Sequence, residues 1–386
     1  MTADHLTVGS LCTGYGGLDL ALKAHFSTRV IWTSEIDRHA SRVVKARYRA
    51  PNLGDLKLID WASIPAPDII TAGYPCQPFS YAGGRNGTED PRHIWPWIAE
   101  GIRHLRPRLA VMENVPGHLT KGFGEVIGTL AEMGYDATWG CVRASDAGAC
   151  HRRERVFIVA TDTTNQRREW EWVARGRGDG PADRGDAARC PECGAGWNSL
   201  IHQRHAHGWR TNAEVLADRE AATDTDGAGW QGRGRPVESP RELAAAAGHL
   251  PADAGVKLLP TPTVNDSRGG RNITANRSAK KDTTSLGWTL TDVAYADRWG
   301  EYAPAIERWE HVLGRPAPEP VDPKGRLSPV FVEWMMGLRL GHVTAVGLPR
   351  TQELKILGNG VVRQQAALAL THLLPLALTP SRQRSR

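Results

Sequence analysis

Long apolar runs and a secretory leader are missing from this sequence, and cysteine is scarce. No stretch of about 18 uninterrupted apolar residues occurs, which excludes a transmembrane helix. The N-terminal residues lack the basic-then-apolar order of a signal peptide, so we expect a soluble, cytoplasmic protein without a membrane partner. Six cysteines in 386 residues are too few for a disulfide scaffold, which favours buried, catalytic or metal-binding roles for them.

Lysine is also scarce. Only nine of the 48 basic residues are lysine, in a chain whose net charge is +6. Arginine binds phosphates and guanine edges in bidentate fashion, so this bias favours a nucleic-acid partner. A GC-rich genome, whose codons favour arginine, explains the same bias equally well. Apolar residues make up 40% of the chain and charged residues 23%, which excludes a fully disordered protein.

Short apolar runs alternate with helix-like stretches up to about residue 160. Strands are predicted at 6–11, 29–32, 69–72, 109–112 and 156–160, and helices at 17–24, 94–105 and 123–133. This alternation predicts an α/β fold with a doubly wound, mostly parallel sheet. Ligands of such sheets bind beyond the carboxyl ends of the strands.

The chain changes character after residue 160. Residues 161–250 are rich in glycine, arginine, aspartate and alanine and predict a loop-rich insert. Irregular sequence continues to a proline-rich stretch at 316–323. Helical periodicity returns at 331–336 and 363–376, ahead of a basic tail that we expect to be frayed.

Two groups of residues follow predicted strands in the first part of the chain. Gly14, Gly16 and Gly17 allow the backbone to approach a nucleotide-like ligand, and Glu35 is placed to bind ribose hydroxyls. A structural turn alone would also explain the glycines. Cys76 stands in a Pro-Cys-Gln-Pro sequence after the third strand, where the prolines argue against the usual burial of a lone cysteine.

Two further groups come later. Glu113 and Asn114 end the fourth strand, where a dry pocket would keep the glutamate partly protonated. Arg153 and Arg155 precede the last strand, and alternate residues of an extended segment share a face. Taken singly, the glutamate also fits a helix cap or a solvated side chain, and the arginines a solvated edge.

The order and spacing of these motifs strongly resemble the DNA (cytosine-5) methyltransferases. That family has Pro-Cys-Gln, then Glu-Asn-Val, then Gln-x-Arg-x-Arg, then Gly-Asn-x-Val, which appears here from Gly358 to Val361. The resemblance covers about 1–160 and 326–386. It implies that Cys76 adds to carbon 6 of a flipped-out cytosine, so that carbon 5 attacks the methyl group of S-adenosylmethionine.

The resemblance also assigns the remaining site residues. It implies that Glu113 binds the N3 and amine edge of cytosine and that Arg155 binds O2, with Arg153 in support. The cofactor would be held by Gly14, Gly16, Gly17, Leu18, Glu35, Asp55, Pro75, Asn359 and Val361, and the substrate also by Gln77 and Asn114. Three positions depart from the family, since Cys12, His151 and Arg363 replace the usual Phe, Gln and Pro.

The middle of the chain corresponds to the family's target-recognition domain. The expected division is a catalytic domain in two parts, 1–160 and 326–386, around a recognition domain at 161–325. Arg268 and Arg271 are expected to bind DNA. A zinc knuckle is the interpretation of Cys190, Cys193, His202 and His205, with a reduced turn and scattered histidines as the alternative.

The resemblance implies a monomer that methylates double-stranded DNA, with a cognate restriction endonuclease as a candidate partner. Three other functions fit parts of the sequence. An RNA cytosine-5 methyltransferase shares the frame, but the long middle region favours DNA. A catalytically idle DNA-binding relative would have lost Cys76 or Glu113. A nicotinamide dehydrogenase would explain the glycines and Glu35 but not the Pro-Cys-Gln motif.

Overall fold

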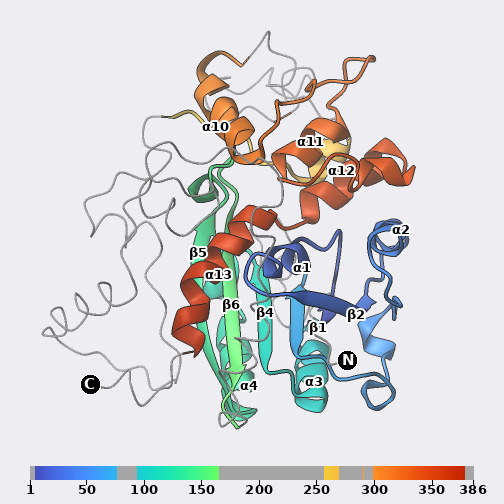
Figure 1. Cartoon of the computed structure of the whole chain (residues 1–386), viewed down its shortest axis with the longest axis vertical. Coiled ribbons are helices and arrows are strands. Elements are labelled where there is room, and N and C mark those ends of the chain that lie inside the picture. The colour runs from blue at the N-terminus through green and yellow to red at the C-terminus, as the bar shows by residue number, and fades with distance from the viewer. Residues whose placement is uncertain (1–4, 76–93, 165–255, 269–289, 291–298, 379–386) are drawn as a thin grey trace, which may run out of the picture.

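A six-stranded sheet forms the centre of the molecule in the computed structural model, which describes residues 5–75, 94–164, 256–268, 290 and 299–378 (Figure 1). The strand order is β2-β1-β3-β4-β6-β5. The first four strands are parallel, while β6 runs antiparallel to β4 and β5. The strands are β1 (Leu6–Leu11), β2 (Thr28–Ser34), β3 (Ile69–Gly73), β4 (Leu109–Asn114), β5 (Tyr135–Arg143) and β6 (Glu154–Asp162).

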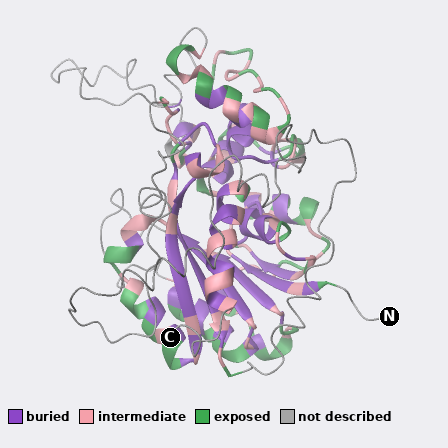
Figure 2. Ribbon diagram, turned by 60° about the vertical axis from the view of Figure 1, so that its left-hand side comes forward, coloured by how far each residue is buried: buried purple, intermediate pink, exposed green. Residues whose placement is uncertain are grey.

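Helices cover the sheet on both faces (Figures 1 and 2). Successive side chains of a strand point to opposite faces, and both sets are apolar here because neither face is left to solvent. Ile69 and Phe157 pack under α1 (Gly17–Leu22) and α13 (Arg363–Leu378). Ile70 and Ile158 pack under α3 (Trp95–Leu105) and α4 (Phe123–Glu132). The expected doubly wound α/β class is confirmed.

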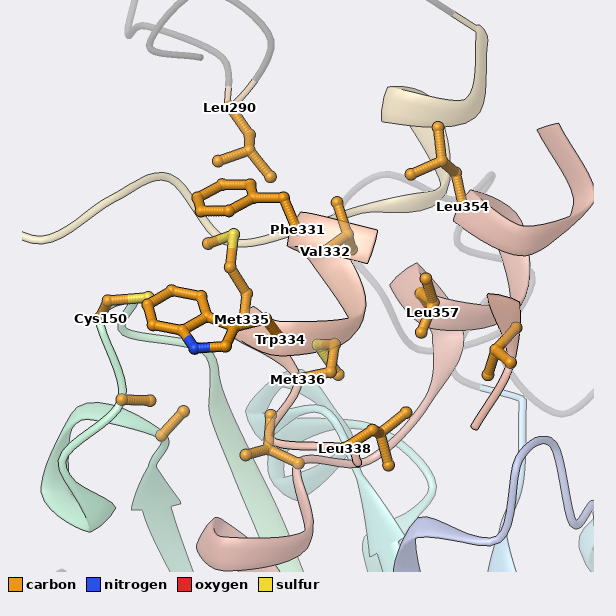
Figure 3. Packing of buried hydrophobic residues seen from close by; sticks show 14 of the residues in the cluster. Cys150, Leu290, Phe331, Val332, Trp334, Met335, Met336, Leu338, Leu354 and Leu357 are labelled. Carbon is orange, nitrogen blue, oxygen red and sulfur yellow. The ribbon is translucent and has the colours of Figure 1, made fainter. Parts of the chain in front are cut away.

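A second group of helices lies beyond the carboxyl ends of β1, β3 and β4. It consists of α10 (Ala303–Leu313), α11 (Pro329–Met335) and α12 (Arg350–Asn359), and α2 (Arg38–Arg47) packs against α12. Phe331 and Trp334 stack within this core, which also contains Met335 and Cys150 (Figure 3). Short 3-10 helices complete the described elements: η1 (Leu56–Leu58), η2 (Trp61–Ser63), η4 (Pro116–Thr120), η5 (Ser145–Ala147), η7 (Val264–Arg268), η9 (Gly300–Tyr302) and η10 (Thr344–Val346).

The predicted strands and helices all appear, with ends that shift by a few residues, but β5, α2, α10 and α12 were not predicted. Strand β5 carries Asp136, Thr138 and Gly140, which hide its strand character in the sequence. Helix α2 begins at Arg38, directly after Asp37, whose side chain accepts from the backbone amides of His39 and Ala40. Helix α10 lies in the region expected to be irregular. In the described part of the chain, no helix is long and apolar enough to cross a membrane.

Candidate active site

The turn between β1 and α1 presents backbone beside a carboxylate. Gly14 and Gly16 have φ of 58° and 84°, a left-handed conformation that glycine adopts without strain. The Gly14 amide donates to Glu35 Oε2 at 2.7 Å, and the space where a Gly14 side chain would stand is open. A side chain on Gly16 would overlap the hydroxyl of Tyr48. The first glycine therefore leaves room for a ligand, whereas Gly16 is required for packing.

Glu35 is held in place from several directions at the end of β2. The Asp37 amide donates to its Oε1 at 2.8 Å, and Asn52 bonds to both its backbone N–H and C=O, at 2.9 and 3.0 Å. Burial raises the pKa of Glu35, although the amides of Asp37 and Gly14 oppose the rise. The Ser34 hydroxyl donates to Gly54 O at 2.8 Å, which brings the next residue, Asp55, to the same strand end.

Residues from the far end of the chain close over the glycine turn. Tyr15 donates its hydroxyl to Val361 O at 2.7 Å, and His342 Nε2 donates to Tyr15 O at 2.8 Å. A side chain on Gly360 would overlap the Tyr15 ring, and one on Gly17 would overlap Val361 O. Gly360 and Val361 are thus brought beside the glycine turn, and Asn359, exposed, is the last residue of α12 before them.

Buried Glu113 and half-buried Arg155 form an ion pair where β4 ends and β6 begins. Arg155 Nε lies 3.0 Å from Glu113 Oε1, and Glu113 is 7% exposed. Burial raises the pKa of Glu113, and the positive charges of Arg155 and Arg153 oppose the rise. Asn114 is buried, and its Oδ1 accepts from the Val115 amide at 2.8 Å. The pair therefore offers a carboxyl whose pKa burial raises, 3.0 Å from a guanidinium nitrogen.

The end of β3 is the point where these groups converge. A carbon added to Gly73 would lie 3.7 Å from Glu113 Oε2, 3.8 Å from Val361 Cγ2 and 3.9 Å from Leu18 Cδ1. Pro75 follows two residues later, half-buried. The structure therefore joins the glycine turn, the far-end segment and the Glu113 pair at the strand that leads to Cys76.

Arg153 and His151 direct their side chains to backbone carbonyls. Arg153 directs its guanidinium to backbone carbonyls of the middle region and of the far end of the chain. His151 is fully buried, and its Nε2 donates to Met335 O at 3.1 Å. Burial lowers the pKa of His151 to about 3, so the ring is neutral. It therefore serves as an uncharged link to α11.

Several predicted site residues cannot be placed. Arg268 is the last residue of η7. No group of three or more potential metal ligands occurs among the residues that the structure describes. The residues outside the described ranges are Cys76, Gln77, Arg271, Cys190, Cys193, His202 and His205.

Two polar groups beneath the site were missed in the sequence. Asp19, 2% exposed, accepts from Ser10 Oγ at 2.8 Å and Thr71 Oγ1 at 2.6 Å, and so joins α1 to β1 and β3. Fully buried His118 bonds through Nδ1 to Lys121 O at 2.9 Å, so its Nε2 accepts from the Tyr74 hydroxyl at 2.8 Å. Asp19 was detectable as a carboxylate on an apolar helix face, whereas the Tyr74 and His118 contact has no sequence signal.

Comparison with known proteins identifies similar sequences and folds. Residues 6–179 match the family model described as C-5 cytosine-specific DNA methylase.

Relatives align with less than half of this chain. It is 36% identical to the type II methyltransferase M.NgoBI of Neisseria gonorrhoeae over 39% of this chain and 48% of that protein. It is also 36% identical to M1.ScrFI of Lactococcus lactis subsp. cremoris, over 39% of this chain and 40% of that one. The matched region thus spans half or less of these relatives. A crystal structure of S. pombe Dnmt2 methyltransferase aligns over 96% of this chain and 99% of that one, with 14% identity and a TM-score of 0.49, too low to support a conclusion.

Proposed function

We propose that this protein is a DNA (cytosine-5) methyltransferase that modifies cytosine within a specific duplex sequence. The convergence of Leu18, Val361 and Glu113 on Gly73 carries the proposal, because Cys76 follows that residue by three positions. A cofactor turn, a buried acid and a nucleophile at one strand end are what methyl transfer to carbon 5 requires.

The residues at the glycine turn fit S-adenosylmethionine. Open space at Gly14 and the carboxylate of Glu35 suit an amino-acid end and a ribose diol, and Asp55 is available for the adenine amine. When bound there, the cofactor supplies the methyl group. The remaining ligands in the proposal are Gly16, Gly17, Leu18, Pro75, Asn359 and Val361.

The side chains around Gly73 and the nearby Cys76 have separate roles in binding and activating the cytosine base. Cytosine carbon 5 is a poor nucleophile until a thiolate adds to carbon 6, which is the role of Cys76. Glu113 supplies a proton to N3, which neutralises the charge that this addition creates, and Arg155 binds O2. Once carbon 5 carries the methyl group, it loses its proton and the bond between Cys76 and carbon 6 breaks, which releases the product. Gln77 and Asn114 complete the substrate contacts. The target base must leave the duplex, which costs a few kcal/mol.

We also propose the division into domains. Residues 1–160 and 326–386 form one catalytic domain, supported by the contacts of Val361 with the glycine turn. Residues 161–325 select the DNA sequence, with Arg268 and Arg271 among the contacts. The protein would act as a cytoplasmic monomer beside a cognate restriction endonuclease.

A structural zinc on Cys190, Cys193, His202 and His205 belongs to the same proposal. It would stabilise a region poor in apolar residues. Elemental analysis of purified protein should find about one zinc per chain. Metal-free protein with full sequence specificity would contradict it.

Bisulfite sequencing tests the proposed activity. Duplex DNA incubated with the protein and S-adenosylmethionine should become protected at cytosines in one sequence context. The Glu113→Gln variant keeps the shape of the side chain but loses the donated proton, so methylation should fall by about 10²-fold or more. Methylation of matched RNA, with none of duplex DNA, would favour the RNA enzyme instead.

A further inference from the structure

Arg153 is bound by backbone from two distant parts of the chain. Its side chain is buried, and Nη1 donates to Pro262 O at 3.2 Å. Nη2 donates to Gly358 O at 3.2 Å and to Gly360 O at 2.5 Å. A guanidinium can serve several carbonyls at once because its donors lie in one rigid plane, which the single ammonium of lysine cannot reproduce.

The backbone of Arg153 is also fixed. The backbone φ of Arg153 is 27°, a positive value that residues other than glycine seldom adopt. The Arg153 amide donates to Thr261 Oγ1 at 3.1 Å, and its carbonyl accepts from Gln365 Nε2 at 2.6 Å. Because strain of this kind persists only where surrounding contacts enforce it, these bonds hold Arg153 in one position.

The carbonyls that Arg153 binds belong to the segment that closes over the cofactor turn. Gly360 packs on the Tyr15 ring, and Tyr15 in turn donates to the carbonyl of Val361. On the other side, Gly358 packs against the backbone of Thr263, so closely that an added side chain would overlap it. Arg153 therefore lies between the middle region and the residues that approach Gly14–Leu18.

We propose that Arg153 is a positioning residue for the cofactor. Its guanidinium holds residues 358–360 against the glycine turn and ties the Thr261–Thr263 segment to them, whereas Arg155, two residues later, pairs with Glu113. The inference rests on the proposed function, since it names S-adenosylmethionine as the ligand of that turn. It separates two neighbouring arginines that the sequence motif treats alike.

Calorimetric titration of S-adenosylmethionine into the DNA-free protein separates the two roles. Arg153→Met should weaken cofactor binding about tenfold or more, because charge-assisted bonds to the closing segment are lost. Arg153→Lys should recover part of that loss. The matched variant Arg155→Met should bind the cofactor within about twofold of wild type, because its partner lies at the base site.

Kinetics on duplex DNA give a second readout. Arg153→Met should raise the KM for the cofactor while kcat at saturating cofactor changes less than about threefold, whereas Arg155→Met should lower kcat. Cofactor affinity unchanged in Arg153→Met, with kcat reduced as in Arg155→Met, would overturn the inference and assign Arg153 to the base.

If Arg153→Met does not fold, Tyr15→Phe provides a second test that leaves the Arg153 guanidinium in place. It removes one bond to Val361 O from the same segment, so the cofactor should bind several-fold more weakly, and unchanged affinity would count against the inference. Wild-type protein that bound no S-adenosylmethionine would instead overturn the proposed function itself.

Discussion

The two faces of the sheet are closed by different parts of the chain. One face lies under α3 and α4, which come from the same stretch of sequence as the strands. The other lies under α1 and α13, and α13 begins two hundred residues after β6 ends. Gln365, fully buried, fastens the start of α13 to Val142 O at 2.7 Å and Arg153 O at 2.6 Å. The first part of the chain therefore cannot bury both faces of its own sheet.

The largest effect should come from removing α13. A chain that stops before Arg363 exposes the apolar sheet face and loses four buried leucines of that helix. Each buried leucine contributes about 1.5–3 kcal/mol, so their sum is comparable to the stability of a typical domain. We expect this chain to be unfolded or aggregated by circular dichroism and gel filtration. A chain that stops after Leu378 should match wild type, and a cooperative melt of the shorter chain would show that the α3 and α4 face suffices.

Single core substitutions compare the two faces directly. Leu370 on α13 and Ile98 on α3 are each 0% exposed. Changing either residue to alanine should lower the free energy of unfolding by about 2–5 kcal/mol, measured by urea denaturation. Similar losses with a single transition would mean that both faces fold as one unit. A loss below about 1 kcal/mol for Leu370→Ala alone would mean that α13 is loosely docked.

A smaller, pH-dependent effect should come from Asp19 beneath the α1 face. Burial raises its pKa to about 6, despite the hydrogen bonds from Thr71 and Ser10. The folded protein thus binds the proton of the Asp19 carboxyl more tightly than the unfolded chain does. Protonated Asp19 therefore stabilises the fold fully below about pH 4, and this stabilisation is lost as pH rises through about 6.

The difference in Tm between wild type and Asp19→Asn isolates this group. Between pH 4 and 6 the free energy of unfolding of wild type should fall relative to that of the variant by about 2–3 kcal/mol, and its Tm should fall accordingly. A difference in Tm that stays constant across that range would mean that Asp19 is ionised in the folded protein.

The sequence predicts the strands and helices of the sheet face under α3 and α4 better than it predicts the other elements of the fold. Its strands are short apolar runs and its helices have apolar periodicity, so local pattern is enough. Strand β5 was missed because its polar residues are covered by distant elements, as Thr138 is beside Leu373.

The motifs likewise located Glu113 and Arg155, whose pairing follows from adjacent strands. The different surroundings of Arg153 could not be predicted from the motif, which does not indicate which backbone groups its arginines bind. The partners of Arg153, Gly358 and Gly360, lie about two hundred residues away in the sequence.

Covalent trapping tests the cytosine-5 chemistry most directly. Duplex DNA with 5-fluorocytosine at the methylated position should form an adduct with wild-type protein that survives denaturation, because fluorine cannot leave as a proton does. Cys76→Ala should form none while still binding the DNA. A normal yield of adduct in Cys76→Ala, or methylation by wild type without any adduct, would contradict the role of Cys76 as the nucleophile.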